Sequence, residues 1–161
     1  MSTSNQASYS TTPNIRIIAR GVLLRNEKIL IIKVKDKGGE WWILPGGGQD
    51  FGETLQDCLI RECNEELGIS VNVGPCIMVR EFIGTKKNTV IGDVSNKQFL
   101  ELYFFIHTTE TPDLIPRDPG HLSLEWVDVE KLSSLNFFPK IIIEKLSTNE
   151  IDSPIYVGDA D

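Results

Sequence analysis

A run of glycines that leads directly into an acidic helix is the feature that most constrains how this chain folds. Pro45 favours an extended conformation at the residue before it, so a strand is expected to end there. Gly46, Gly47 and Gly48 then allow positive φ angles and a close approach of the backbone to a ligand. Apolar residues at helical spacing follow and predict a helix over residues 55–67. The chain is therefore expected to pass from a strand through a glycine-rich turn into a helix.

Both ends of this helix carry capping residues. Thr54 is suited to the N-cap, and Asp57 three residues later gives a loose form of the capping box, whose usual partner is Glu or Gln. Gly68 can take the left-handed conformation that closes a helix. The helix is thus expected to begin and end at defined residues.

Three glutamates make the interior of the helix unfavourable for stability. At about 100° per residue, Glu62, Glu65 and Glu66 fall in one arc that borders the apolar stripe of the helix. Like charges at these spacings repel by about 0.2–0.5 kcal/mol per pair, and they lie in the last turns, where the helix dipole is already negative. Arg61 offsets only part of this repulsion. A divalent cation would remove it, and hard carboxylate oxygens suit magnesium, with manganese as the alternative.

Two interpretations of the acidic cluster are open at this point. A solvated acidic face is the simpler one, and three glutamates alone favour it. The preceding glycines favour the other, in which a phosphate-chelating metal lies between glycine backbone and carboxylates. Competing motifs are absent, because the sequence has no P-loop pattern, no EF-hand loop, and only His107 and His121 to support zinc.

The segment from Gly47 to Ile69 resembles the Nudix box, G-x5-E-x7-R-E-U-x-E-E-x-G-U, in which U is usually aliphatic. The fixed positions are matched at the correct spacing by Gly47, Glu53, Arg61, Glu62, Glu65, Glu66 and Gly68. Cys63 is the one departure, since it occupies a U position, where a cysteine can pack as a small hydrophobe. The lead-in from Leu44 to Gly47 is also typical of the family.

This resemblance implies a fold and a reaction. The fold is an α/β/α sandwich, a mixed β-sheet flanked by helices, over residues 14–147, between a disordered tail at 1–13 and a loosely held acidic tail at 148–161. The reaction is magnesium-dependent hydrolysis of a phosphoanhydride bond in a nucleoside diphosphate linked to another group, such as a nucleoside triphosphate or a nucleotide sugar. A nucleotide-binding or sensor domain without turnover is the alternative.

The resemblance also implies roles for individual residues. Four residues are expected to hold the metal ion: Gly46 through its carbonyl, Glu62, Glu65 and Glu66. Three are expected to contact the substrate: Gly46, Gly47 and Gly48. Arg61 and Glu53 are expected to pair and orient the helix as part of the catalytic machinery. The general base stays open between Glu62, Asp118 and Glu125.

Substrate specificity lies outside the box and rests on weaker features. ADP-ribose and dinucleoside-polyphosphate hydrolases tend to carry a proline or a tyrosine where residues 84–87 of this chain have neither. The aromatic residues that could stack on a base are Trp41, Trp42, Phe82 and Tyr103. The cationic residues that could meet phosphates are Arg16, Arg20, Arg80, Lys86 and Lys87. Core packing and solvated charge are the simpler roles for these two groups.

Composition argues against several other classes of protein. The net charge of −7 opposes non-specific binding of nucleic acid, so the expected partner is a small nucleotide. No apolar run approaches the roughly 18–20 residues that cross a membrane. Cys58, Cys63 and Cys76 are too few for a disulfide framework and indicate buried thiols of a cytoplasmic protein. A homodimer is compatible with the sequence.

Hydrophobic patterning outside the box predicts the remaining elements. Strands are expected at 15–24, 29–35, 41–44, 99–107 and 123–129, and one or two strands at 71–83. A hairpin connection is expected at 25–28, a long loop at 108–121, and a closing helix at 138–146.

Overall fold

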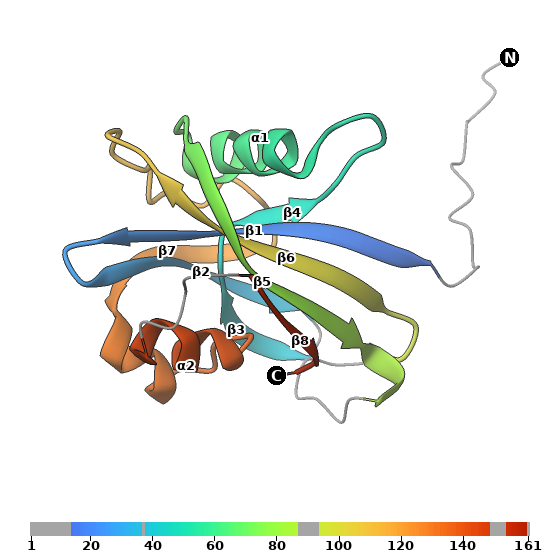
Figure 1. Cartoon of the computed structure of the whole chain (residues 1–161). Coiled ribbons are helices and arrows are strands. Elements are labelled where there is room, and N and C mark those ends of the chain that lie inside the picture. The colour runs from blue at the N-terminus through green and yellow to red at the C-terminus, as the bar shows by residue number, and fades with distance from the viewer. Residues whose placement is uncertain (1–13, 37, 87–93, 149–153, 161) are drawn as a thin grey trace, which may run out of the picture.

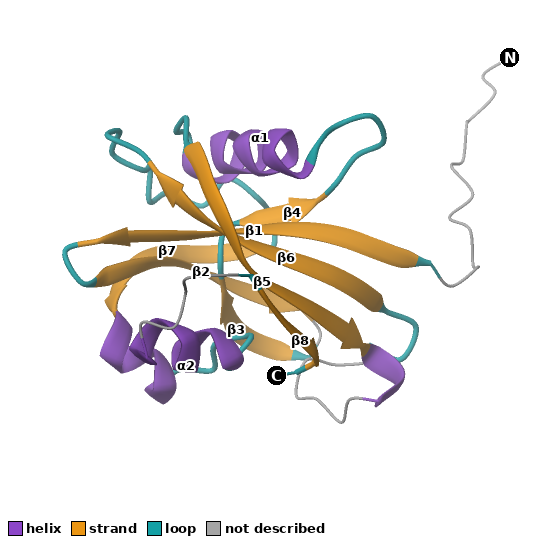
Figure 2. Cartoon of the chain, viewed as in Figure 1, coloured by secondary structure: helices purple, strands orange, loops and turns teal. Residues whose placement is uncertain are grey.

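A mixed β-sheet with one α-helix on each face forms the molecule (Figures 1 and 2). The computed structural model describes residues 14–36, 38–86, 94–148 and 154–160. Its strands are β1 (Ile15–Arg25), β2 (Lys28–Asp36), β3 (Gly39–Ile43), β4 (Gly46–Gly48), β5 (Asn72–Ile83), β6 (Gln98–His107), β7 (His121–Asp128) and β8 (Ile155–Asp159). Its helices are α1 (Leu55–Leu67), α2 (Ile141–Thr148) and the short 3-10 turns η1 (Gly84–Lys86) and η2 (Val129–Ser134).

The order of the strands confirms the expected mixed sheet. Along the sheet the order is β3-β2-β1-β6-β5-β8, while β4 pairs with β1 and β7 pairs with β2. The pairs β1–β6 and β5–β8 are parallel, and the other pairs are antiparallel. Because α1 and α2 cover opposite faces, the architecture is an α/β/α sandwich.

The hairpin between β1 and β2 shows how local residues set the register. Asn26 and Glu27 have φ angles of 51° and 61°, as the two central residues of a type I′ turn require. This turn pairs Arg25 with Lys28 at the start of the ladder. The expected hairpin is confirmed, and it joins β1 to β2.

Strand β2 is buried on both faces, which explains its nearly continuous hydrophobic sequence. Leu30 and Ile32 belong to the core cluster under α1. Ile29 and Ile31 belong to the second cluster, which contains Ile142 of α2. The alternation follows from the two-residue period of a strand. Each helix therefore closes its own hydrophobic layer.

The clearest differences from the expected elements lie at the glycine run and at the start of helix α2. Gly46–Gly48 is not a free loop, because it pairs with Ile18–Arg20 as strand β4, and only Gly46 of the three has a positive φ, at 126°. Helix α2 begins at Ile141 rather than at residue 138. The N–H of Phe138 donates to the carbonyl of Trp42 at 2.9 Å, and Pro139 disfavours a helical conformation at the residue before it.

The prediction of a loosely held tail at 148–161 is wrong for residues 155–159. Ile155–Asp159 forms strand β8, which pairs in parallel with β5. Every residue of β8 is half-buried or exposed, so its hydrophobic pattern is too weak to indicate a strand from the sequence. The expected N-terminal tail at 1–13 lies outside the described residues. No helix in the described ranges is long and apolar enough to cross a membrane.

Candidate active site

The caps expected for the acidic helix are confirmed. The backbone N–H of Asp57 donates to the hydroxyl of Thr54 at 3.1 Å, and the N–H of Thr54 donates to the Asp57 carboxylate at 3.3 Å. At the other end Gly68 has φ 65°, and its N–H donates to the carbonyl of Asn64 at 3.0 Å. Both ends of α1 are therefore fixed, which fixes the positions of the acidic side chains between them.

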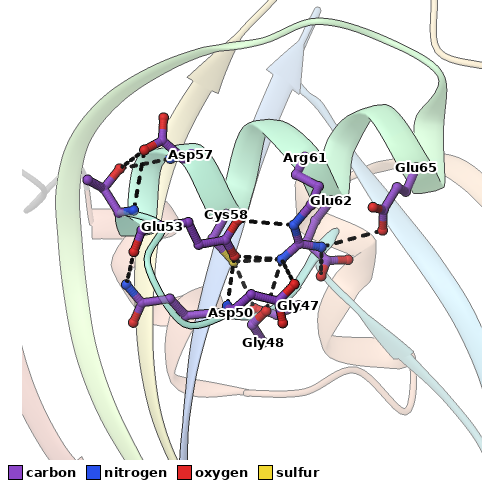
Figure 3. Close-up of polar contacts among 11 residues, drawn as sticks. Gly47, Gly48, Asp50, Glu53, Asp57, Cys58, Arg61, Glu62 and Glu65 are labelled. Carbon is purple, nitrogen blue, oxygen red and sulfur yellow. Dashed lines mark hydrogen bonds and ion pairs between the residues drawn. The ribbon is translucent and has the colours of Figure 1, made fainter.

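Arg61 joins the helix to the glycine segment before it (Figure 3). Its Nε and Nη2 donate to the two carboxylate oxygens of Glu53 at 3.1 and 2.7 Å. The same Nη2 donates to the carbonyl of Gly48 at 3.1 Å, and Nη1 donates to Glu62 at 2.8 Å. This bidentate pairing with Arg61, together with the Asp50 N–H, lowers the pKa of Glu53 to about 2.

Glu66 is the buried acid of the helix, with only 8% of its surface exposed. Its Oε2 accepts a hydrogen bond from the N–H of Gly46 at 2.8 Å. Its Oε1 lies 3.6 Å from Nε2 of His121. Burial raises the pKa of Glu66 to about 8, and the Gly46 N–H and the positive charge of Arg20 offset this only in part. A buried carboxylate with incomplete compensation is a site that a cation would stabilise.

Two of the β4 glycines lie where a side chain would not fit. A Cβ on Gly47 would lie 2.4 Å from the carboxylate of Glu62. A Cβ on Gly46 would lie 2.1 Å from the carbonyl oxygen of Ala19. These glycines therefore let strand β4 fit between β1 and the carboxylates of α1.

The structure brings together some of the expected metal ligands and not others. Glu62 and Glu66 both approach the β4 glycines. Glu65 stands apart, because its side chain is 58% exposed and touches Arg61 at 3.5 Å. The Gly46 carbonyl, also an expected ligand, accepts a hydrogen bond from Nη1 of Arg20 at 2.9 Å. Within the described part of the chain, no three His, Cys, Asp or Glu side chains converge closely enough to hold a metal ion.

His121 and Asp118 also lie near Glu66. Nothing in the sequence indicated that His121 belongs to the site. The Asp118 carbonyl accepts the N–H of His121 at 3.0 Å, which folds this loop over the acid. The negative charge of Asp118 adds to the raised pKa of Glu66. Burial lowers the pKa of His121, so its ring is neutral near pH 7, and its Nδ1 is buried with no hydrogen-bond partner among the described residues.

Glu125, another expected candidate for the general base, lies on the other face of the sheet. Its neighbour Leu124 packs in the core cluster that contains Cys63 of α1. Because side chains alternate along a strand, Glu125 points away from α1. It accepts a hydrogen bond from the Ser123 hydroxyl at 3.1 Å. Of the two later acids, the structure therefore places only Asp118 beside the box.

A cavity of about 200 Å³ opens between β2–β3 and the strands β1, β5 and β6. Its lining includes three of the aromatic residues expected to stack on a base, Trp41, Phe82 and Tyr103, and two of the expected cations, Arg20 and Arg80. Trp42 is not among these residues, and it packs instead under the ammonium group of Lys33. Arg16 lies over Gly48, and Lys87 is outside the described residues.

Arg20 connects this cavity to the box. Its Nη1 donates to the carbonyls of Leu44 and Gly46 at 3.1 and 2.9 Å. Its Nε lies 3.7 Å from Glu101, which lines the cavity. Arg20 therefore lies between the cavity and the box. A ligand with a planar ring in the cavity and phosphates at the box would pass this arginine.

Comparison with known proteins shows the family to which this fold belongs. A family described as the NUDIX domain matches residues 15–146. The uncharacterized Nudix hydrolase YvcI of Bacillus subtilis (strain 168) is 40% identical over 119 residues, which is 73% of this chain and 69% of that protein. An RNA pyrophosphohydrolase of Ruthia magnifica subsp. Calyptogena magnifica is 44% identical over 50 residues, 31% of this chain and 28% of that protein.

Solved structures agree with this assignment at the level of the fold. The crystal structure of a MutT protein from Bacillus halodurans superposes with a TM-score of 0.69 at 19% identity, covering 89% of this chain and 88% of that one. The chain belongs to the Nudix family of hydrolases.

Proposed function

We propose that this protein is a magnesium-dependent pyrophosphohydrolase whose substrate is a nucleoside diphosphate linked to another group, such as a nucleoside triphosphate or a nucleotide sugar. The observation that carries the proposal is the buried carboxylate of Glu66 against the Gly46 N–H, with Glu62 packed on Gly47 beside it. Nudix hydrolases generally use divalent metal ions.

The residues at this place fit a hard divalent cation. Glu62 and Glu66 supply carboxylate oxygens, the donor type that magnesium prefers. Burial opposes the negative charge of Glu66, so a bound cation would restore its ordinary acidity. Glu65 is exposed, so packing does not fix its rotamer, and a bound cation could draw its carboxylate in. When bound, the ion would neutralise phosphate oxygens and increase the acidity of a water molecule.

Other residues of the site position the helix and accept a proton. Arg61 holds the helix against the glycine strand through its hydrogen bond to the Gly48 carbonyl, and Glu53 orients Arg61 through their bidentate pair. Asp118 is the acid best placed to accept a proton from water, because it lies beside Glu66 on a loop, whereas Glu125 faces away. Glu62 is the alternative base within the box.

The aromatic cavity is suited to the nucleoside end of such a substrate. Phe82 and Phe99 stack with their ring centroids 5.5 Å apart, and Trp41 lies across the cavity on β3. Flat apolar walls bind planar rings by stacking. Arg20, between this cavity and Gly46, is placed to meet the phosphates that join the two ends.

The substrate class is tested by a panel of compounds with magnesium. Nucleoside triphosphates, nucleotide sugars, dinucleoside polyphosphates and ADP-ribose are incubated with the protein, and the products are identified. Release of pyrophosphate, as against two monophosphates, fixes the bond that is cleaved. The proposal fails if no compound of the panel is hydrolysed.

Glu66→Gln tests the metal site itself. The amide keeps the shape and can still accept the Gly46 N–H but loses the charge that holds a cation, so we expect kcat to fall by at least a hundred-fold with the fold retained. Glu125→Gln is the matched control, since it makes the same change on the opposite face, and its activity should stay within about two-fold. Unchanged turnover in Glu66→Gln would exclude the proposed metal site.

A further inference from the structure

A buried carboxylate lies inside the aromatic cavity. Glu101, in the middle of β6, is only 5% exposed and lines the cavity. Two donors reach it, the hydroxyl of Tyr103 at 2.8 Å and Nη1 of Arg80, and both bind the same oxygen, Oε2. A buried charged group is costly unless a complete set of hydrogen-bond partners surrounds it.

Among the described residues, none donates a hydrogen bond to the other oxygen of Glu101, Oε1. Its nearest cation is Nε of Arg20 at 3.7 Å, which is beyond hydrogen-bond distance. If Oε1 were both unpaired and sealed from solvent, it would be a buried unsatisfied atom. The only side-chain atom of that kind among the described residues is Nδ1 of His121. Oε1 of Glu101 is therefore accessible rather than sealed, and since the residue lines the cavity, this acceptor is open to a ligand there.

The carboxylate is held rigidly at this position. Arg80, which binds Oε2, also donates from Nε to the carbonyl of Ala160, just beyond β8. On the other side, Arg20 is fixed by the carbonyls of Leu44 and Gly46. A fixed acceptor discriminates between ligands better than a mobile one, because it cannot turn to meet a different group.

We propose that Glu101 is the specificity-determining residue of the cavity and accepts a hydrogen bond from a ring N–H or amino group of the bound nucleobase. This rests on the proposed function, in which the cavity holds the nucleoside end of the substrate. A base that offers no donor would cover this oxygen, leave it unpaired and bind more weakly. The contact acts on recognition of the base and not on the chemistry at α1.

The first test uses the unaltered protein. Dissociation constants for ATP, GTP, CTP and UTP are measured by calorimetry with a chelator present, so that the result does not depend on turnover. The tightest ligand is then compared with its analogue in which the ring N–H and amino hydrogens are replaced by methyl groups. We expect the analogue to bind at least ten-fold more weakly. Equal affinities of the two compounds would overturn the proposal.

The second test separates hydrogen bonding from the bulk of the methyl groups. Glu101→Gln can keep an acceptor for Arg80 and Tyr103 and turns an amide donor toward the cavity, so we expect the penalty for methylation to fall below three-fold and the order of the four nucleotides to change. Glu81→Gln is the control, because that carboxylate binds the exposed Tyr156 hydroxyl at 3.0 Å, outside the cavity. The same nucleotide order in Glu101→Gln and the unaltered protein would also overturn the proposal.

Kinetics distinguish this proposal from the proposed function. With magnesium and the best substrate, Glu101→Gln should raise KM at least ten-fold and leave kcat within about three-fold. A fall in kcat at unchanged KM would contradict a role in recognition. If the protein hydrolyses nothing on the panel and yet shows the base selectivity in calorimetry, the proposed function fails and the role of Glu101 stands. If Glu101→Gln does not fold, the methylated analogue on the unaltered protein decides the question.

Discussion

At the scale of single residues, Glu66 is an acid whose surroundings oppose its charge. Burial raises its pKa from 4.5 to about 8 in the folded protein. Between these two values the folded state binds more protons than the unfolded state, so the free energy of unfolding falls as pH rises through this window. The contribution of Glu66 is fully present below pH 4.5 and is lost as pH passes about 8.

The metal-free protein is therefore expected to lose stability between about pH 5 and about pH 8, and Glu66→Gln should remove most of this slope because the amide does not titrate. Urea unfolding at several pH values in the presence of a chelator measures it. Glu65→Gln is the control, since that side chain is largely exposed. Identical slopes for the unaltered protein and Glu66→Gln would show that this acid is not destabilised by burial.

The site residues that the sequence indicated are those linked by short spacings on one helix or its lead-in. The pairing of Glu53 with Arg61 is implied by the resemblance to the Nudix box, and the structure contains it. His121 and Glu101 carry no such signal, because each reaches the site through strand pairing with residues far away in the chain. A single histidine or glutamate in a strand has the same appearance in the sequence whether it faces a cavity or solvent.

At the scale of elements, the capping box of α1 contributes to stability through hydrogen bonds between residues three apart. Thr54→Ala removes the hydroxyl that accepts the Asp57 N–H, so we expect a loss of about 1 kcal/mol in the free energy of unfolding. Thr54→Ser keeps the hydroxyl and should cost much less. Thermal unfolding of the two variants measures the difference. Equal losses in both variants would show that the methyl group and not the cap is responsible.

The elements differ in how far their own residues specify them. Helix α1 was predicted with its bounds, because its caps and its apolar spacing all lie within the segment. Strand β4 has no side chains to give a pattern, and it becomes a strand only because β1 offers backbone partners and Arg61 binds its Gly48 carbonyl. Strand β8 depends in the same way on the edge of β5. Pairing of this kind is non-local and cannot be derived from the segment itself.

At the scale of the whole molecule, the C-terminal strand joins the end of the chain to the cavity. Val157 of β8 packs against the core cluster under α2, and the carbonyl of Ala160 binds Arg80, which in turn holds Glu101. Arg20 lies beside Glu101 and also donates a hydrogen bond to the Gly46 carbonyl in the box lead-in. The cavity and the acidic helix are thus linked through buried charged groups rather than through the apolar core alone.

Removal of residues 154–161 should therefore destabilise the whole protein. The buried guanidinium of Arg80 loses its hydrogen bond to Ala160, a charged interaction worth about 1.5–3 kcal/mol. For a chain of this size we expect the Tm to fall by about 5 °C or more. Tyr156→Phe is the control, because it removes only the exposed hydrogen bond to Glu81 and should lower the Tm by less than about 2 °C. An unchanged Tm in the shortened protein would mean that β8 adds no stability and that Glu101 is held by Arg80 and Tyr103 alone.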